Sequence, residues 1–164
     1  KQKTAYEIPK RDWSSDVCSS DLRFPSHAGA MFNLGVLDME DDRLEPAREW
    51  FGRVIAIAPD EADARLNLGI VLYKLAIYDD ALEHLRRALE INPSLAQAHN
   101  ARGNVYARGG RLRDARDAFR AALAIAPNLS VAHEGLASVC FALFEIGREP
   151  ALADEVQQIG RANV

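Results

Sequence analysis

Apolar side chains in the central part of the chain recur at helical spacing, and the whole pattern returns every 34 residues. The spacing is seen most simply in Pro59, Pro93 and Pro127. Three further residue types keep the same register: Gly35, Gly69 and Gly103; Ala47, Ala81 and Ala115; Ile57, Ile91 and Ile125. Because independent positions agree, we interpret the chain as a repeat protein.

Each unit contains two helical stretches. In residues 62–95, Leu66, Ile70 and Tyr73 follow the period of a first helix, and Ala81 and Leu85 follow that of a second. The same two stretches are present in the units before and after this one. One such pair cannot bury its apolar face alone, whereas stacked pairs can. The pattern therefore predicts an all-α fold built from stacked antiparallel helix pairs.

Polar residues and prolines mark the ends of the predicted helices. We expect Asp79-Asp80 to form the break between the two helices of the middle unit. Pro93 lacks an N–H group and disfavours helix at the residue before it, so the second helix should end there. The polar residue after each proline is expected to cap the next helix; these residues are Asp60, Ser94 and Asn128.

The pattern resembles the tetratricopeptide repeat (TPR) family. Its marks are Leu-Gly in the first helix, then Ala, an aromatic residue and Ala in the second, and Pro after it. They stand here as Leu34-Gly35, Ala47, Phe51 and Pro59; Leu68-Gly69, Ala81, Leu85, Ala88 and Pro93; and Gly103, Tyr106, Ala115, Phe119, Ala122 and Pro127. The resemblance implies a right-handed α-solenoid with units at residues 28–61, 62–95 and 96–129.

Residues 130–164 depart from the repeat. Ala137 replaces the glycine and Cys140 replaces the tyrosine of the other units. With a three-residue insertion, Gly147 falls on the turn between two helices. A second helix would then place its apolar residues at Leu152, Val156 and Ile159. We interpret 130–164 as a divergent helix pair that either caps the solenoid or is a fourth repeat.

Residues 1–22 show no helical or strand periodicity. Translated in one frame, the two constant parts of a common short-read sequencing adapter resemble KQKTAYEI and DWSSDVCSSDL, which together make up most of this segment. We therefore expect 1–22 to be a non-native, disordered tail and the TPR domain to comprise residues 23–164. The native N-terminus would then be missing, which leaves the compartment open, with the cytoplasm as the default.

Composition narrows the function classes. The chain has 20 Lys and Arg against 24 Asp and Glu, a net charge of −4, which argues against sequence-independent binding of nucleic acid. The longest apolar run, at 136–144, is about half of the roughly 18 residues that span a bilayer. Two cysteines cannot form a disulfide scaffold. No phosphate loop, nucleophile elbow or metal motif is present, so we expect no enzyme, no cofactor and no metal.

The family resemblance implies a binding surface on the concave side, which the first helix of each repeat lines. The residues expected there are Phe32, Asn33, Val36, Leu66, Asn67, Ile70, Tyr73, Asn100, Asn104 and Arg108. Asn33 and Asn67 are one repeat apart and could form two rungs of a ladder that pairs with peptide backbone. Ala101 interrupts the ladder, and Asn-Leu-Gly is also common repeat sequence, so a structural role stays open.

Other candidate sites carry less weight. Some family members hold a C-terminal carboxylate with basic residues, but Phe32, Val36, Gln97 and Ala101 stand at the corresponding positions here. A metal site at His84, His99 and His133 lacks cysteine or acidic partners at ligand spacing, and we favour packing roles for these side chains. Trp50 could anchor a partner or pack on the convex side.

Two functions remain in competition. The first is a module that binds a protein or peptide partner in the concave groove. The second is a substrate-recruiting region of a larger enzyme, such as a glycosyltransferase, sulfotransferase or methyltransferase, which rests on analogy alone. We also expect apolar surface on the outer face of the helix that begins near Ala28, with Phe24 beside it, and hence self-association or fraying there.

Overall fold

The computed structural model describes residues 27–147 of the chain. Within that part it contains seven helices and no strand. They are α1 (Ala28–Glu40), α2 (Leu44–Ile57), α3 (Ala62–Lys74), α4 (Tyr78–Ile91), α5 (Ala96–Arg108), α6 (Leu112–Ile125) and α7 (Ser130–Gly147). None of these helices is both long and apolar enough to cross a bilayer.

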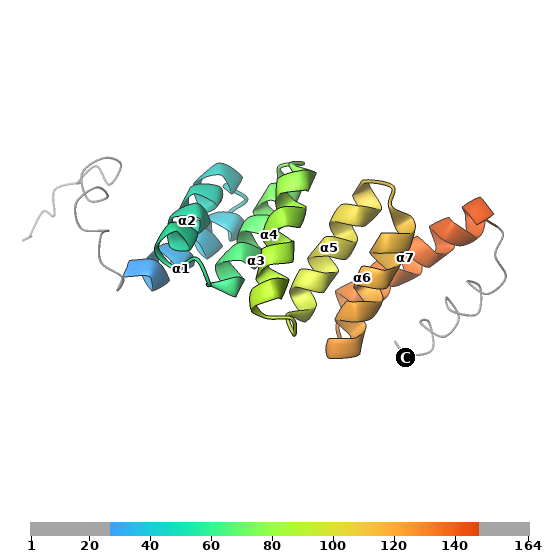
Figure 1. The fold of residues 1–164 in the computed structure, drawn as a ribbon. Coiled ribbons are helices and arrows are strands. Elements are labelled where there is room, and N and C mark those ends of the chain that lie inside the picture. Colours follow the sequence, from blue (N-terminus) through green and yellow to red (C-terminus); the bar gives the residue numbers. More distant parts are fainter. Residues whose placement is uncertain (1–26, 148–164) are drawn as a thin grey trace, which may run out of the picture.

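Consecutive helices pair and the pairs stack in a single row (Figure 1). Within a pair the helices are joined by the short segments 41–43, 75–77 and 109–111, and α6 also packs against α7. Most contacts between successive pairs run from the second helix of one pair to the first helix of the next. The predicted all-α solenoid of helix pairs is confirmed.

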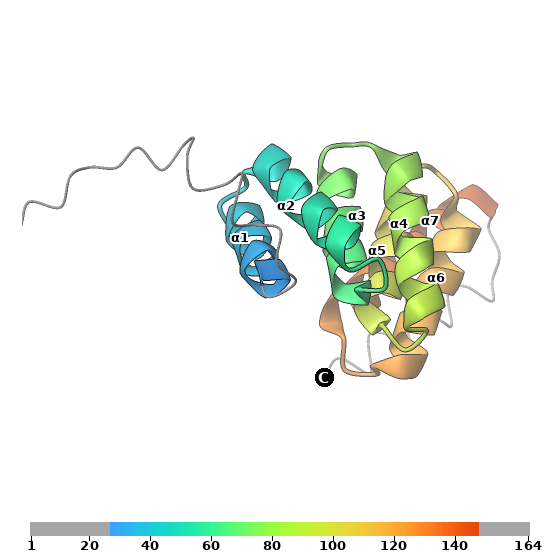
Figure 2. The same cartoon turned by 60° about the vertical axis from the view of Figure 1, so that its left-hand side comes forward.

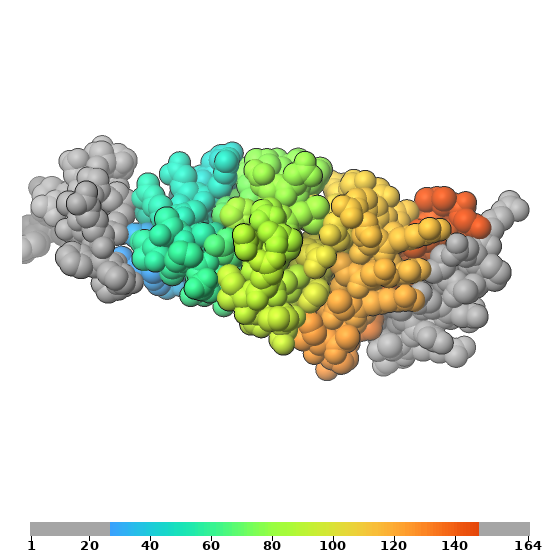
Figure 3. Space-filling model, in the orientation of Figure 1, coloured from blue at the N-terminus to red at the C-terminus, as the bar shows by residue number. Residues whose placement is uncertain are grey.

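The first helices of successive pairs form the inner layer. The helix α1 contacts α3, α3 contacts α5, and α5 contacts α7, whereas α2, α4 and α6 make at most marginal contact with one another. Helices on the inside of a curved stack lie closer together than those outside. In Figure 1 the second helices lie toward the viewer, Figure 2 shows the row from the side, and Figure 3 shows this outer face filled mainly by their side chains.

Each pair is held together by a large side chain of the second helix that lies on a glycine of the first. A Cβ atom on Gly35 would lie 2.9 Å from the ring of Phe51, and one on Gly69 would lie 2.7 Å from Leu85. Phe51 and Leu85 are completely buried. The glycines therefore recur because the second helix needs this close approach, and the repeat length keeps each contact in register.

The helix starts differ from the predicted caps. Helices α3 and α5 begin after Glu61 and Leu95, one residue later than expected, and neither N-cap side chain makes a capping hydrogen bond. The prediction for Asp60 and Ser94 was wrong because the turn after each proline is longer. Its backbone closes instead through the Glu61 and Leu95 N–H groups, which donate to the carbonyls of 58 and 92.

The turn inside each pair also differs from the prediction. Helix α4 begins at Tyr78, so Asp79 and Asp80 lie in its first turn rather than between the helices. Acidic side chains are favourable there because the helix N-terminus carries partial positive charge. The chain reverses through residues with positive φ at equivalent positions, namely Asp42 at 57°, Ala76 at 61° and Gly110 at 73°.

The last described helix is longer than expected. Helix α7 continues through Gly147, where the sequence predicted a turn. The helix packs against α6 through buried side chains that include Leu136 and Cys140, and its last residues, such as Ile146 at 76% exposure, extend into solvent. The predicted second helix with Leu152, Val156 and Ile159 lies outside the described residues, as do the tail 1–22 and Phe24.

The outward side of α1 exposes apolar residues that are buried in the next repeat. Leu34 is 43% exposed, whereas Leu68 at the equivalent position is 6% exposed. Leu37 is 55% exposed, whereas its equivalents Val71 and Val105 are at most 2% exposed. In the later repeats the second helix of the preceding pair covers these positions, and no described helix does so for α1.

Candidate partner-binding face

The expected binding residues lie on the inner layer formed by α1, α3 and α5. Asn33 and Arg108 are exposed, and seven others are half-buried: Phe32, Val36, Asn67, Ile70, Tyr73, Asn100 and Asn104. Leu66 is only 3% exposed and belongs to the central hydrophobic core. Leu66 therefore packs inside the protein and is not part of the surface that a partner could contact. Ala101, which interrupts the asparagine register, is also buried.

Asparagines supply most of the polar groups on this face. Asn33 of α1 and Asn67 of α3 occupy equivalent positions one repeat apart. The side-chain oxygen of Asn100 is buried and has no hydrogen-bond partner among the described residues. An amide offers two donors and an acceptor, and a buried unpaired acceptor is unfavourable. The Asn100 oxygen is therefore unpaired but buried, and the amides accessible on this face are those of the exposed Asn33 and the half-buried Asn67 and Asn104.

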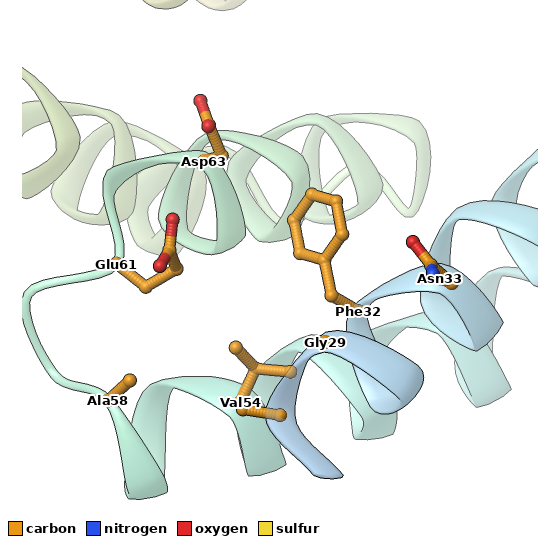
Figure 4. A pocket seen from close by; sticks show the side chains of 8 residues that line it. Gly29, Phe32, Asn33, Val54, Ala58, Glu61 and Asp63 are labelled. Carbon is orange, nitrogen blue, oxygen red and sulfur yellow. The ribbon is translucent and has the colours of Figure 1, made fainter. Parts of the chain in front are cut away.

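A cavity of about 280 Å³ opens at one end of this face, between α1, α2 and α3. It is lined by Ala28, Gly29, Phe32, Asn33, Val54, Ala58, Glu61 and Asp63. Figure 4 shows Phe32 and Asn33 on α1 and Glu61 across the space from them, with Asp63 on the first turn of α3 and its carboxylate directed away from Val54. The half-buried Ala58, in the segment after α2, supplies apolar surface, and Val54 of α2 closes the base of the cavity at 2% exposure.

The walls of this cavity are held in place. The ring of Phe32 packs edge-on against Phe51, with ring centroids 5.7 Å apart and an interplanar angle of 68°. Val54 packs in a small core cluster with Met31 and Ala64. Sequence reasoning found Phe32 and Asn33 but missed Glu61 and Asp63. One sequence signal could have revealed the cavity. The positions equivalent to Glu61 in the next two units are the apolar Leu95 and Leu129.

Two of the three histidines considered for a metal site, His99 and His133, contact backbone carbonyls, whereas the buried Nδ1 of His84 has no hydrogen-bond partner among the described residues. The side chain at the fourth position of three successive units reaches back to a proline carbonyl. Arg65 Nε donates to Pro59 O at 2.8 Å, and His133 Nε2 lies 2.7 Å from Pro127 O. His99 Nε2 lies 3.3 Å from Pro93 O. Among the described residues no three His, Cys, Asp or Glu side chains are placed to hold a metal ion.

Two histidines have shifted acidities. Burial lowers the pKa of His84 from its ordinary value of 6.5, and the nearby Arg65 lowers it further against the opposing effects of Asp80 and Glu83. Burial also lowers the pKa of His99, although its contact with the Pro93 carbonyl acts in the opposite direction. Both imidazoles therefore favour the neutral state in the folded protein.

The outer face is dominated by paired charges. Arg86 pairs with Glu83 and Glu90, and Arg87 pairs with the same two carboxylates. Arg111 donates to Asp114 at 2.7 Å. This pairing is typical of a solvated helix surface.

Trp50, the alternative anchor, is half-buried. It packs beside Met31 and Val54, under the guanidinium of Arg53 at 4.9 Å from its ring.

Comparisons with known proteins agree with this architecture. A family model described as tetratricopeptide repeat matches residues 52–96 and 66–130. No curated protein matches the chain significantly. Among solved structures, MamA superposes with a TM-score of 0.76 at 19% identity, over 85% of this chain and 80% of that one.

Two further structures are informative. The second TPR domain of human RPAP3, solved in complex with an HSP70 peptide, has a TM-score of 0.65 at 23% identity, over 70% of this chain and 95% of that one. A mutant O-GlcNAc transferase of Thermobaculum terrenum has a TM-score of 0.68 at 26% identity, over 70% of this chain but only 22% of the transferase.

Proposed function

Because the chain belongs to the tetratricopeptide repeat family, we propose that it is a protein-interaction module whose inner face binds an extended segment of a partner protein. The binding surface is the half-exposed part of α1, α3 and α5. It includes the amides of Asn33, Asn67, Asn100 and Asn104, the apolar side chains of Phe32, Val36, Ile70 and Tyr73, and Arg108. In this proposal the module has no catalytic residues of its own.

The single observation that carries the proposal is the set of unpaired amides on the inner face. Asn33 and Asn67 lie one repeat apart, and no described side chain is hydrogen-bonded to either. Amides of this kind can pair with the N–H and C=O groups of an extended backbone whatever its side chains. Half-buried apolar residues beside them exclude water and strengthen such hydrogen bonds.

Structural neighbours support the type of ligand without identifying it. RPAP3 domains with this fold were solved with peptides of HSP90 or HSP70. The basic residues that hold a terminal carboxylate in some family members are replaced here by Phe32, Val36, Gln97 and Ala101. We therefore infer that this module binds an internal segment of its partner.

A second candidate function is recruitment of substrates to a larger enzyme. The observation favouring it is the likeness to the O-GlcNAc transferase, of which the matching region is only 22%. In that case the inner face would bind the segment of a protein substrate and a separate catalytic domain would act on it. A glycosyltransferase, a sulfotransferase or a methyltransferase would use the same repeat surface.

The test is peptide binding by the full chain with and without the amides. Blocked nonapeptides selected from a random library are titrated against the wild type and against the double variant Asn33→Ala, Asn67→Ala. Loss of two hydrogen bonds should weaken binding about tenfold or more, at unchanged melting temperature. Asn128→Ala removes an exposed amide from the loop between α6 and α7, which is not one of the proposed binding residues, and should leave affinity unchanged.

Two outcomes would contradict the proposal. One is that the library yields no peptide that binds. The other is that selected peptides bind the double variant as tightly as the wild type, which would place their site elsewhere on the surface.

A further inference from the structure

We propose that the cavity between α1, α2 and α3 is a specificity pocket for a cationic side chain, lysine or arginine, of the bound segment. This inference rests on the proposed function and names the chemistry of one position in the ligand. The cavity is lined by Phe32, Val54, Ala58, Glu61 and Asp63, and Asn33 stands at its edge (Figure 4).

The cavity occurs where the other repeat junctions place a leucine. Glu61 immediately precedes α3, and the equivalent residues before α5 and α7 are Leu95 and Leu129. Both leucines pack against the hydrophobic clusters of their junctions. Glu61 is exposed instead, and its junction keeps an open space of about 280 Å³. The segment between the first and second helix pairs therefore lacks an apolar contact that Leu95 and Leu129 make at the two later junctions between pairs.

The shape and surface of the cavity suit a long side chain with a charged end. The half-buried Phe32 and Ala58 present apolar surface that can cover an aliphatic stem, and the buried Val54 lies behind them. The ring of Phe32, fixed by its edge contact with Phe51, can receive a cation on its exposed side. Arginine and lysine both combine a stem of methylene groups with a cationic end.

The charged groups of the cavity have no counterion within the described part of the chain. Glu61 and Asp63 form no ion pair and no side-chain hydrogen bond with any residue among 27–147, although other acidic residues of this region are paired. Two unpaired carboxylates beside apolar surface create a negative potential that a cation would neutralise. Asp63 also stabilises the N-terminus of α3, so its effect on the fold needs a control.

The same charges do not recur at the later junctions. Gln97 and Val131 stand at the positions equivalent to Asp63, next to the two leucines. The acidic pocket therefore belongs to the first junction alone among those described. Val54 also differs from its equivalents Ala88 and Ala122, so the lining of this cavity is particular to the first junction.

The pocket is continuous with the amide face. Asn33 lines the cavity and is also the first amide of the row that continues at Asn67. A peptide backbone held by Asn33 would therefore carry one of its side chains past Phe32 into the cavity. The pocket would select that residue while the amides bind the backbone regardless of sequence.

The test separates selectivity from binding. A positional-scanning library of blocked nonapeptides, with Arg, Lys, norleucine or Glu fixed at each position in turn, is bound to the full chain. We expect Arg or Lys to be enriched about tenfold over norleucine at one position, since a charge-assisted contact is lost in the neutral analogue. The double variant Glu61→Gln, Asp63→Asn should lose this enrichment and keep its affinity for the norleucine pool.

A matched control uses the same type of substitution elsewhere. Asp79→Asn removes an acidic residue from the first turn of α4, as Asp63→Asn does for α3, but Asp79 does not line the cavity. It should lower the melting temperature to a similar extent and leave the enrichment intact. Glu61→Leu restores the residue of the other junctions; it should raise the melting temperature by about 2–4 °C while abolishing the enrichment.

Two results would overturn the inference while leaving the proposed function standing. One is binding of the library with no preference for a cation at any position. The other is a cation preference that survives in the Glu61→Gln, Asp63→Asn variant. If no pool binds, the proposed function fails and the inference fails with it.

Discussion

A Cβ atom on Gly103 would lie 2.6 Å from the ring of Phe119, which is 1% exposed. Real Cβ atoms do not approach other atoms this closely, so the backbone of α5 and the ring of α6 are in direct contact. Gly135 of α7 approaches the same ring from the next helix at the same distance. Phe119 is thereby fixed between two helices of adjacent repeats, and it links the pair α5/α6 to α7.

Gly103→Ala should therefore destabilise the fold by about 1–3 kcal/mol, because the added methyl group forces the Phe119 ring or the helix to move. Chemical unfolding followed by circular dichroism measures the change. Gly52 of α2 provides the control, since nothing lies within 4 Å of a Cβ built there. Gly52→Ala should stabilise by about 0.5–1 kcal/mol through helix propensity. Equal effects of the two substitutions would contradict this packing.

The turns inside the pairs predict opposite effects of glycine and alanine. Ala76 has φ of 61° and Gly110 has φ of 73° at equivalent positions. A left-handed conformation costs about 1 kcal/mol for a residue with a Cβ atom. Ala76→Gly should therefore raise the free energy of unfolding by about 0.5–1 kcal/mol, and Gly110→Ala should lower it by about 1 kcal/mol. Denaturant midpoints that shift in the same direction for both would refute the assignment of these turns.

Acidification should destabilise the folded chain in the range where histidines titrate. The pKa values of His84 and His99 are lowered in the folded state, mainly by burial, from the ordinary histidine value of 6.5. Below that pH the unfolded chain therefore binds more protons than the folded chain. The contribution of these neutral histidines to the free energy of unfolding is fully present above pH 6.5. It is lost as the pH falls from 6.5 toward the folded pKa values.

Melting temperatures at about pH 7.5 and about pH 5.5 measure this loss. The double variant His84→Gln, His99→Gln should show a smaller decrease over the same interval, because glutamine does not titrate. If the variant and the wild type lose the same stability, the destabilisation arises from other groups.

Because Leu34 and Leu37 on the outward side of α1 are exposed, we expect charged substitutions there to leave the fold intact. Leu34 and Leu37 are 43% and 55% exposed, whereas Leu68 and Val71 at the equivalent positions of α3 are buried. The double variant Leu34→Glu, Leu37→Glu should therefore stay folded, whereas Leu68→Glu should cost about 3 kcal/mol or more. Circular dichroism compares their stabilities.

The same face carries the prediction of self-association. Sedimentation velocity of the wild type over a range of concentrations should show reversible oligomers, and the charged double variant should be monomeric throughout. A monomeric wild type would end the self-association hypothesis. Hydrogen exchange should also show weaker protection in α1 than in α3, and equal protection in a monomer would count against fraying of this end.

The 34-residue period was sufficient to predict the helix pairs and their stacking. A repeated contact such as Gly69 with Leu85 imposes the same residues at the same positions in each unit, and it is therefore visible along the chain. Helix ends were less predictable. Side-chain caps compete with backbone turns of similar stability, and the turn before α5 closes at Leu95, not at Ser94.

The sequence by itself determined the repeat, the family and the row of asparagines, because periodic packing constrains every unit in the same way. Tertiary structure alone decided which of those residues are exposed, since burial of Leu66 depends on neighbouring helices. It also decided the acidic cavity. Phe32, Val54 and Glu61 come from three different segments, and they meet only when three helices pack around a junction that lacks its leucine.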